Sequence, residues 1–204
     1  MTRDQSLEAL MATARAEFLR YGFDGTDVNR IARRSGVAPT TFYRWFKDKT
    51  EVFIAVYRRW EADEQQAMRR LLAGGGALSA MTEACVEHHR THALFRRSLR
   101  RLSHEEARVR QALAASRLER LNGLKLRMGV PRPSDTDLAV ELLLFEALTL
   151  VLAEGDLVDM GLDDATARRQ LGGILARWRT EPVRAANDTI VETPREREPS
   201  LVRT

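Results

Sequence analysis

Helical periodicity constrains the fold of this chain more than any other feature of its sequence. Apolar residues recur at spacings of three and four, as in Leu7, Leu10, Met11, Ala14 and Phe18, and this spacing places them on one face of a helix. No segment alternates apolar and polar residues as a half-buried strand would. We therefore expect an all-α fold.

Capping and helix-breaking residues divide this pattern into about nine helices. Thr2 has the capping-box spacing to a glutamine three residues later, Gly22 ends the first helix, and Thr26 is expected to cap a short second helix. A third helix starts near Ala38, and a long fourth helix follows Asp48 and ends before a run of three glycines. The remaining helices are expected at roughly 77–91, 94–102, 105–128, 135–154 and 164–179.

Composition indicates an ordinary globular chain. Its 204 residues are 44% hydrophobic and 30% charged, and no apolar run approaches the roughly 18 residues of a membrane helix. The longest candidate, 142–153, contains Glu146 and Thr149. The N-terminus lacks the apolar core of a signal peptide, and Cys85 is the single cysteine. We expect a cytoplasmic protein with no membrane association.

Charge is distributed unevenly along the sequence. Residues 1–49 contain nine Lys and Arg against six acids, a balance of +3, and residues 94–110 contain six against two, a balance of +4. Residues 134–180 contain four bases against nine acids, a balance of −5. This asymmetry favours a polyanionic partner for the first part of the chain.

Residues 26–46 have the pattern of a helix-turn-helix, with a capped helix, a turn at Gly36 and a second helix with a short polar face. Small side chains on that face could approach base edges, and neighbouring cations and helix N-termini could hold phosphates. A small helical bundle without DNA-binding activity would share this spacing. The residues expected to face outward are Ala38, Pro39, Thr40 and Tyr43, those expected to face inward are Val37, Phe42 and Phe46, and those expected to hold phosphate are Arg44, Lys49 and the helix starts at Thr26 and Asp48.

Two segments make the pattern more specific: Phe18-Leu-Arg-Tyr-Gly-Phe-Asp-Gly-Thr26 and Ile31-Ala-Arg-Arg-Ser-Gly-Val-Ala-Pro-Thr-Thr-Phe-Tyr-Arg-Trp-Phe-Lys-Asp-Lys49. Together they resemble the DNA-binding module of tetracycline-repressor-type (TetR family) regulators, from residue 6 to about residue 57. The resemblance implies that Ala38, Pro39, Thr40 and Tyr43 read an operator, and that Thr26, Thr41, Arg44 and Lys49 hold phosphates. Asp27 departs from the Ser or Thr often found there, and its charge would repel a phosphate near Thr26.

The resemblance also implies a domain organisation. Residues 1–48 would form a three-helix DNA-binding domain, and residues 49–180 a larger helical domain for ligand binding and dimerisation. Residues 181–204 are rich in Pro, Arg, Glu and Thr without helical periodicity, and from this composition we expect a disordered tail. The helix expected at 135–154 is apolar on all sides, so it needs both a core and a further partner. We expect a homodimer formed through the last two helices. A central core helix of a monomer is the alternative.

Large or polarisable side chains on the helices of the second domain are candidates for an effector pocket. Each of them would also be an ordinary core residue. Cys85, His88 and His92 share a helical face, but the first and last lie about 10 Å apart along the axis, too far for one ion. We expect no metal and no cofactor. The candidate effector-binding residues are Trp60, Met81, Cys85, His88, Phe95, Phe145 and Glu146.

Four arginines, Arg96, Arg97, Arg100 and Arg101, form a basic strip on the helix expected at 94–102. The strip could be a solvated face paired with acids such as Glu105. In the family that the chain resembles, this helix lies near the DNA-binding module and relays ligand binding to it. The sequence does not separate the two interpretations.

We find no catalytic motif: no phosphate-binding glycine loop, no nucleophile elbow, no HExxH and no paired carboxylates at a plausible site. The sequence thus predicts a transcriptional regulator, a repressor by resemblance, that binds a palindromic operator and is released by a small, mainly hydrophobic effector. An alternative is a DNA-bound regulator whose second domain docks a protein instead.

Overall fold

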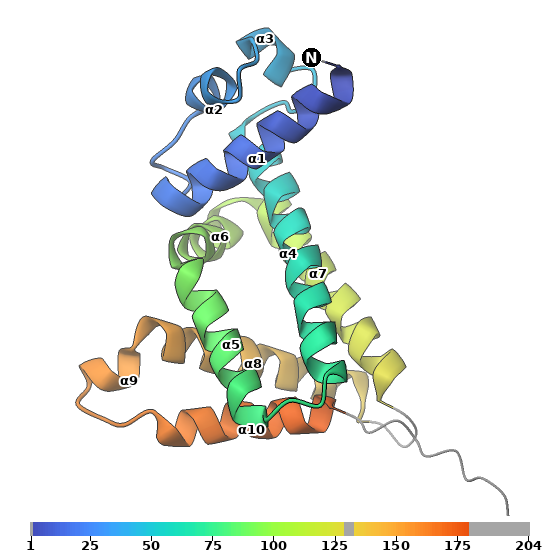
Figure 1. Ribbon diagram of the computed structural model, residues 1–204, viewed down its shortest axis with the longest axis vertical. Coiled ribbons are helices and arrows are strands. Elements are labelled where there is room, and N and C mark those ends of the chain that lie inside the picture. The colour runs from blue at the N-terminus through green and yellow to red at the C-terminus, as the bar shows by residue number, and fades with distance from the viewer. Residues whose placement is uncertain (1, 129–132, 180–204) are drawn as a thin grey trace, which may run out of the picture.

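The computed structural model describes residues 2–128 and 133–179, and within them every regular element is a helix (Figure 1). The expected tail at 181–204 lies outside the described residues. The helices are α1 (Arg3–Tyr21), α2 (Val28–Arg34), α3 (Pro39–Phe42), α4 (Lys49–Ala73), α5 (Leu78–Thr91), α6 (Ala93–Glu105), α7 (Ala107–Arg127), α8 (Asp135–Glu154), α9 (Asp156–Asp159) and α10 (Ala165–Trp178). The all-α expectation is confirmed.

The first helix begins and ends where local sequence predicts. Thr2 accepts a hydrogen bond from the Gln5 amide, and the Gln5 side chain accepts one from the Thr2 amide at 2.8 Å, which completes a capping box. Gly22 has a φ of 68° and donates its N–H to the Phe18 carbonyl. A side chain at this φ would be strained, so glycine ends α1 at low cost.

The expected cap of the second helix was wrong by one residue. Asp27, not Thr26, caps α2, because its carboxylate accepts the Arg30 amide at 2.8 Å. Thr26 is buried, and its hydroxyl donates to the Glu17 carboxylate at 3.1 Å. Glu17 also pairs with Arg30 at 2.7 Å and with Arg34 at 3.0 Å. A buried carboxylate needs such partners, and they tie α1 to α2.

The turn between α2 and α3 follows the expected pattern. Gly36 has a φ of 72°, a conformation that favours glycine. Val37, Phe42 and Phe46 are buried, as predicted. Proline at the first position of α3 removes no hydrogen bond, because that amide has no partner within a helix.

Two apolar cores share the long helix α4 (Figure 1). The N-terminal core joins α1, α2 and α3 to the first half of α4 and to α6 and α7; it includes Phe18, Phe42, Phe53, Trp60, Phe95 and Val109. The C-terminal core joins α5, α7, α8 and α10 and includes Met81, Cys85, Leu138, Phe145, Leu171 and Trp178. Between them α4 carries two acids, Glu61 and Glu64, which are almost covered.

Helix α8 has the apolar surface that its sequence predicts on more than one side. Leu138 and Leu142 are buried in the C-terminal core. Val140, Leu143 and Leu144 are about half exposed in this single chain, at 49%, 47% and 51%. Leu143 lies at the cavity described below, whereas Val140 and Leu144, four residues apart on one helical face, are a candidate contact surface.

One short helix was not predicted, so the described residues form ten helices instead of about nine. Gly155 adopts a left-handed φ of 82°, which ends α8 and reverses the chain into α9. Sequence reasoning assigned this segment to a loop because it lies between two glycines. In the described residues no helix is long and apolar enough to cross a membrane.

The Glu17 contacts generate a stability prediction. Glu17→Ala should lower the free energy of unfolding by about 1 to 3 kcal/mol, because it leaves the Thr26 hydroxyl and two arginines without their carboxylate. Glu8→Ala is the matched control on the same helix, since the Glu8–Arg59 pair is exposed and worth less than about 1 kcal/mol. Urea unfolding measures both. Equal losses in the two variants would contradict this role of Glu17.

Candidate DNA-binding surface and ligand cavity

The helix-turn-helix presents a contiguous exposed surface at α3. Ala38, Pro39, Thr40 and Arg44 are exposed, and the side chain of Tyr43 is 59% exposed. The Tyr43 ring packs edge-on against buried Phe42, with 5.5 Å between centroids. The core therefore fixes the base of the tyrosine while its hydroxyl end faces solvent. Thr41 lies beside this surface and is half-buried.

Two of the expected phosphate contacts are engaged inside the protein. Thr26 donates to Glu17, as described above. Lys49 donates from Nζ to the Phe23 carbonyl at 2.9 Å and to the Thr26 carbonyl at 3.0 Å, and it lies 4.0 Å from the centre of the Phe23 ring. Burial lowers the pKa of Lys49. In this structure Lys49 anchors the loop between α1 and α2.

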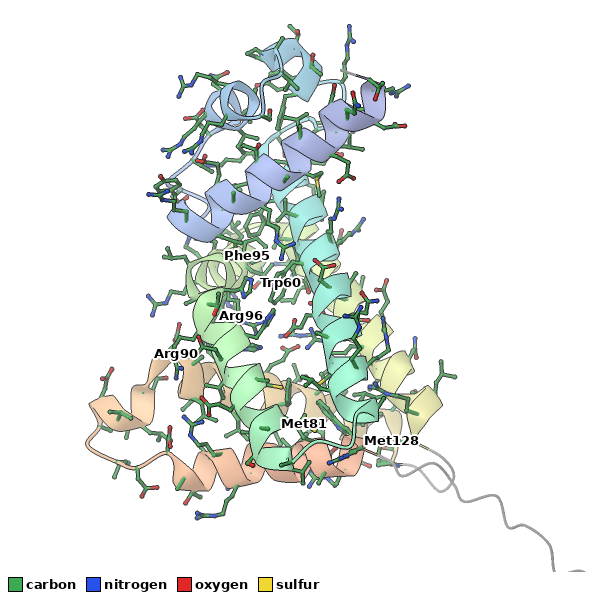
Figure 2. All side chains as sticks on the ribbon, viewed as in Figure 1. Trp60, Met81, Arg90, Phe95, Arg96 and Met128 are labelled. Atoms are coloured by element: carbon green, nitrogen blue, oxygen red, sulfur yellow. The ribbon has the colours of Figure 1, made fainter. Side chains whose placement is uncertain are left out.

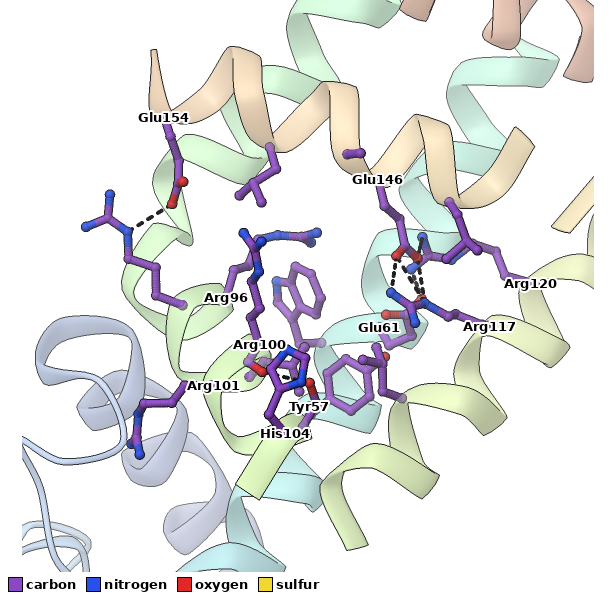
Figure 3. Close-up of a pocket in the computed structure, with 18 residues that line it drawn as sticks. Tyr57, Glu61, Arg96, Arg100, Arg101, His104, Arg117, Arg120, Glu146 and Glu154 are labelled. Atoms are coloured by element: carbon purple, nitrogen blue, oxygen red, sulfur yellow. Dashed lines mark hydrogen bonds and ion pairs between the residues drawn. The ribbon is translucent and has the colours of Figure 1, made fainter. Parts of the chain in front are cut away.

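A cavity of about 660 Å³ lies between α4, α6, α7 and α8 (Figure 3). Its size is that of a small-molecule site. Tyr57 and Trp60 from α4 form one side, and Leu113 from α7 and Leu143 from α8 add apolar surface. The charged residues of its lining are Glu61, Arg96, Arg97, Arg100, Arg101, Arg117, Arg120, Glu146 and Glu154.

The structure places only two of the seven candidate effector residues in this cavity. Trp60 and Glu146 line it, whereas Phe145 lines a smaller pocket of about 60 Å³. Met81 and Cys85 are buried in the C-terminal core. The other two candidates lie elsewhere: His88 is half-buried against Trp60, and Phe95 is buried in the N-terminal core.

The sequence predicts few charges in a pocket between the helices of Trp60, Met81 and Phe145, whereas the cavity beside α6 has a charged lining. Six arginines and three glutamates line it. Sequence reasoning gave no role to Arg117 and Arg120, although their spacing of three on α7 places them on one helical face. That spacing was the available signal, and a solvated face would have produced the same pattern.

Most of these charges neutralise one another. Arg117 pairs with Glu146 at 2.6 Å, and Arg120 pairs with Glu61 and approaches Glu146 at 3.5 Å and Glu64 at 3.7 Å. The carboxylates raise the pKa of Arg120 although burial opposes this. Figure 3 shows this network on one side of the cavity.

A histidine cluster lies next to the network. Burial lowers the pKa of His89 to about 4, although its Nε2 lies 3.5 Å from a Glu64 oxygen. Burial raises the pKa of Glu64, but the His89 hydrogen bond and the Arg120 charge outweigh it and bring that pKa to about 2. The His88 ring stacks on Trp60 at 5.5 Å. Within the described part of the chain, no group of three or more His, Cys, Asp or Glu side chains is arranged to hold a metal.

Helix α6 connects the cavity wall to the N-terminal helices. The Phe23 amide donates to Ser98 Oγ at 2.9 Å, and Arg101 donates to Asp24 at 2.6 Å. The Phe95 ring lies 4.9 Å from the Phe53 ring, and Figure 2 shows Phe95 beside α4 with Trp60 and Arg96 nearby. The loop after α1 is thus held by the helix that lines the cavity.

Comparison with known proteins agrees with this architecture. Residues 10–56 match the family model of the bacterial regulatory proteins of the tetR family. The fold also matches that of a protein from Rhodococcus sp. described as a TetR-family transcriptional regulator. The match has a TM-score of 0.61 and 18% identity, and it covers 88% of this chain and 100% of the Rhodococcus chain.

Two further solved structures match over most of their length. A TetR-family regulator from Mesorhizobium loti MAFF303099 has a TM-score of 0.57 and 18% identity over 87% of this chain and 96% of the other. The fatty acid degradation regulator FadR from Bacillus halodurans has a TM-score of 0.54 and 14% identity over 82% and 93%.

Residues 10–56 therefore match the tetR family model, and the described chain has the fold of the solved TetR-family structures. The fold and the family resemblance predicted from the sequence are confirmed.

The buried histidine generates a pH prediction. The folded-state pKa of His89, about 4, lies below the ordinary value of about 6.5, so the unfolded chain binds more protons between these values. The free energy of unfolding should therefore fall as the pH is lowered from 6.5 towards 4, by at most about 3 kcal/mol. Partly buried His88, whose pKa burial also lowers, adds to this trend.

Urea unfolding between pH 7 and pH 5 measures this effect. His89→Gln should flatten the dependence, because glutamine can donate to Glu64 without titrating. His104→Gln, at an exposed site, is the control and should keep it. A His89→Gln variant with the wild-type slope would contradict the prediction.

Proposed function

We propose that this chain is a homodimeric transcriptional repressor that binds a palindromic operator and releases it when a small molecule fills the cavity beside α6. The observation that carries the regulatory part is the bonding of α6, a wall of the cavity, to the loop after α1 through Ser98 and Arg101. In this proposal residues 1–48 bind DNA and residues 49–180 bind the ligand and dimerise. A DNA-binding role places the protein in the cytoplasm.

The exposed surface of α3 supports the DNA-binding role of individual residues. Ala38, Pro39, Thr40 and Tyr43 would reach base edges, because they are exposed and short or rigid. Arg44 would hold phosphate from the exposed end of this surface, and Thr41 would assist. Thr26 and Lys49 would act indirectly, by positioning the loop that α6 also contacts.

The contacts of α6 support a route from ligand to DNA. A ligand in the cavity touches α6, and Arg101, which belongs to the same lining, holds Asp24 in the loop after α1. If the bound ligand favours one position of α6, it favours one position of the N-terminal helices. Only a ligand with different affinities for the two positions changes operator binding. A coupling of about 1 to 3 kcal/mol corresponds to a 5- to 150-fold change.

The cavity also favours a small molecule over the alternative of a docked protein. A docking surface would be filled with side chains, whereas about 660 Å³ lies open between α4, α6, α7 and α8. The lining does not favour the mainly hydrophobic effector expected from sequence, because it carries nine charged residues.

The DNA-binding part is tested on an operator obtained by selection from random duplexes. Tyr43→Ala should weaken binding by about tenfold and relax the sequence preference. Arg44→Ala should weaken binding to all sequences and reduce the salt slope by about one counterion. Arg169→Ala, an exposed change on distant α10, is the control. If Tyr43→Ala and Arg44→Ala match this control in a salt titration, α3 is not the recognition helix.

The exposed side of α8 supports dimerisation. Leu144→Arg should convert the dimer to a monomer in sedimentation at micromolar concentration, because a charge would enter an apolar interface. The side chain is 51% exposed in the single chain, so its circular dichroism should not change. Leu118→Arg, at a 60% exposed site on α7, should remain dimeric. A monomeric wild-type protein would refute this assembly.

A further inference from the structure

The strongest unexplained feature of the cavity is a pair of arginines on α6 without a counter-ion. Arg97 pairs with Glu154 at 2.9 Å, Arg101 with Asp24 and Glu105, and Arg117 and Arg120 with Glu61 and Glu146. Within residues 2–128 and 133–179, Arg96 and Arg100 form no ion pair and donate no side-chain hydrogen bond. Neither has a direct counter-ion: Arg100 is exposed, and half-buried Arg96 interacts with Glu61, Glu64 and Glu146 only at longer range.

The spacing of Arg96 and Arg100 along α6 places both guanidinium groups at the same part of the cavity. Arg96 and Arg100 are four residues apart and so lie on one face of α6. Figure 3 shows Arg96 and Arg100 both extending from α6 into the cavity. Arg96 is partly buried, and its guanidinium carbon lies 5.5 Å from the centre of the Trp60 ring.

An unsatisfied buried donor lies in the same place. Trp60 is 2% exposed and lines the cavity, and its Nε1 has no hydrogen-bond partner among the described residues. A buried N–H group without a partner costs free energy, and Trp60 borders the cavity, so a ligand acceptor that reached Nε1 would relieve this cost. Burial lowers the pKa of Arg96 more than the surrounding carboxylates raise it, and an anion at this place would relieve that penalty.

We propose that the cavity binds an organic anion, with a carboxylate or phosphate group held by Arg96, Arg100 and the indole N–H of Trp60. An oxyanion offers the several lone pairs that two guanidinium groups and one indole require. The body of the ligand lies against Tyr57, Leu113 and Leu143, since a bare inorganic anion would leave most of the 660 Å³ empty. This inference rests on the proposed function and specifies its effector class.

The inference is tested with two dyes that share one aromatic body. 8-Anilinonaphthalene-1-sulfonate carries an anionic group, and N-phenyl-1-naphthylamine is its neutral counterpart. Fluorescence titration of the full-length dimer should show the sulfonate binding at least about tenfold more tightly, because its oxyanion gains hydrogen bonds to charged donors. Displacement by decanoate, decyl phosphate and decanamide then identifies the anionic group. Either acid should compete, and the amide should not.

Single substitutions locate the anion. Arg96→Met and Arg100→Met should each weaken binding of the sulfonate dye by about tenfold and leave the neutral dye unchanged. Arg97→Met is the matched control, since this arginine lies on the same helix and cavity but already has Glu154 as partner; it should change the affinity less than about threefold. Unchanged circular dichroism excludes unfolding as the cause.

Three outcomes would overturn the inference: equal affinity for both dyes, no binding of either, or equal effects of Arg97→Met and Arg96→Met. Operator titration in the presence of each dye separates this inference from the proposed function. If the sulfonate binds through Arg96 and Arg100 but leaves operator affinity unchanged, the anion site stands and regulation through it fails. If the neutral dye binds equally and weakens operator binding, regulation stands and the anion site fails.

Discussion

The pairing of buried charges at the middle of α4 determines much of this structure. Glu61 and Glu64 lie between two apolar cores, where an unpaired carboxylate would cost several kcal/mol. Arg120 reaches both acids and approaches Glu146, so α4, α7 and α8 must keep one register. These paired charges form a polar layer that separates the two apolar cores. The cavity lies beside this layer, and Glu61, Arg120 and Glu146 form part of its charged wall.

Helix α6 relates this cavity to the DNA-binding surface. One face of the helix carries Arg96 and Arg100 towards the cavity, while Ser98 and Arg101 hold the loop after α1. Phe95 packs against Phe53, so a displacement of α6 is opposed by an aromatic contact as well as by hydrogen bonds. The helix-turn-helix is therefore held on α6 by hydrogen bonds and an ion pair as well as by the N-terminal core.

Sequence reasoning succeeded where the determinants are local. The capping box of Thr2, the positive φ at Gly22 and Gly36, and the burial of Phe42 follow from neighbours a few residues away. It failed for Thr26 because Glu17, the partner of its hydroxyl, lies on another helix. Short-range spacing assigned the cap to Thr26, and the more favourable arrangement uses Asp27.

The cavity could not be predicted for a related reason. Its charged wall brings together Glu61, Arg120 and Glu146, which are separated by 59 and 26 residues. Periodicity shows which face of a helix is polar but not which polar faces meet. Aromatic and sulfur-containing residues such as Met81 and Phe95 were therefore predicted to line a pocket, although they are buried in the two apolar cores. The partner of the exposed apolar residues on α8 could not be predicted either, because a single sequence does not show which surface covers them.

The central claim is the coupling through α6, and hydrogen–deuterium exchange of the protein with and without its selected operator tests it most directly. Coupling between two sites is reciprocal, so DNA bound at α3 must alter the helix that lines the cavity. We expect changed exchange at Phe23 and across residues 93–105, beyond any DNA contact. Changes confined to the helix-turn-helix, with α6 unaltered, would contradict the account.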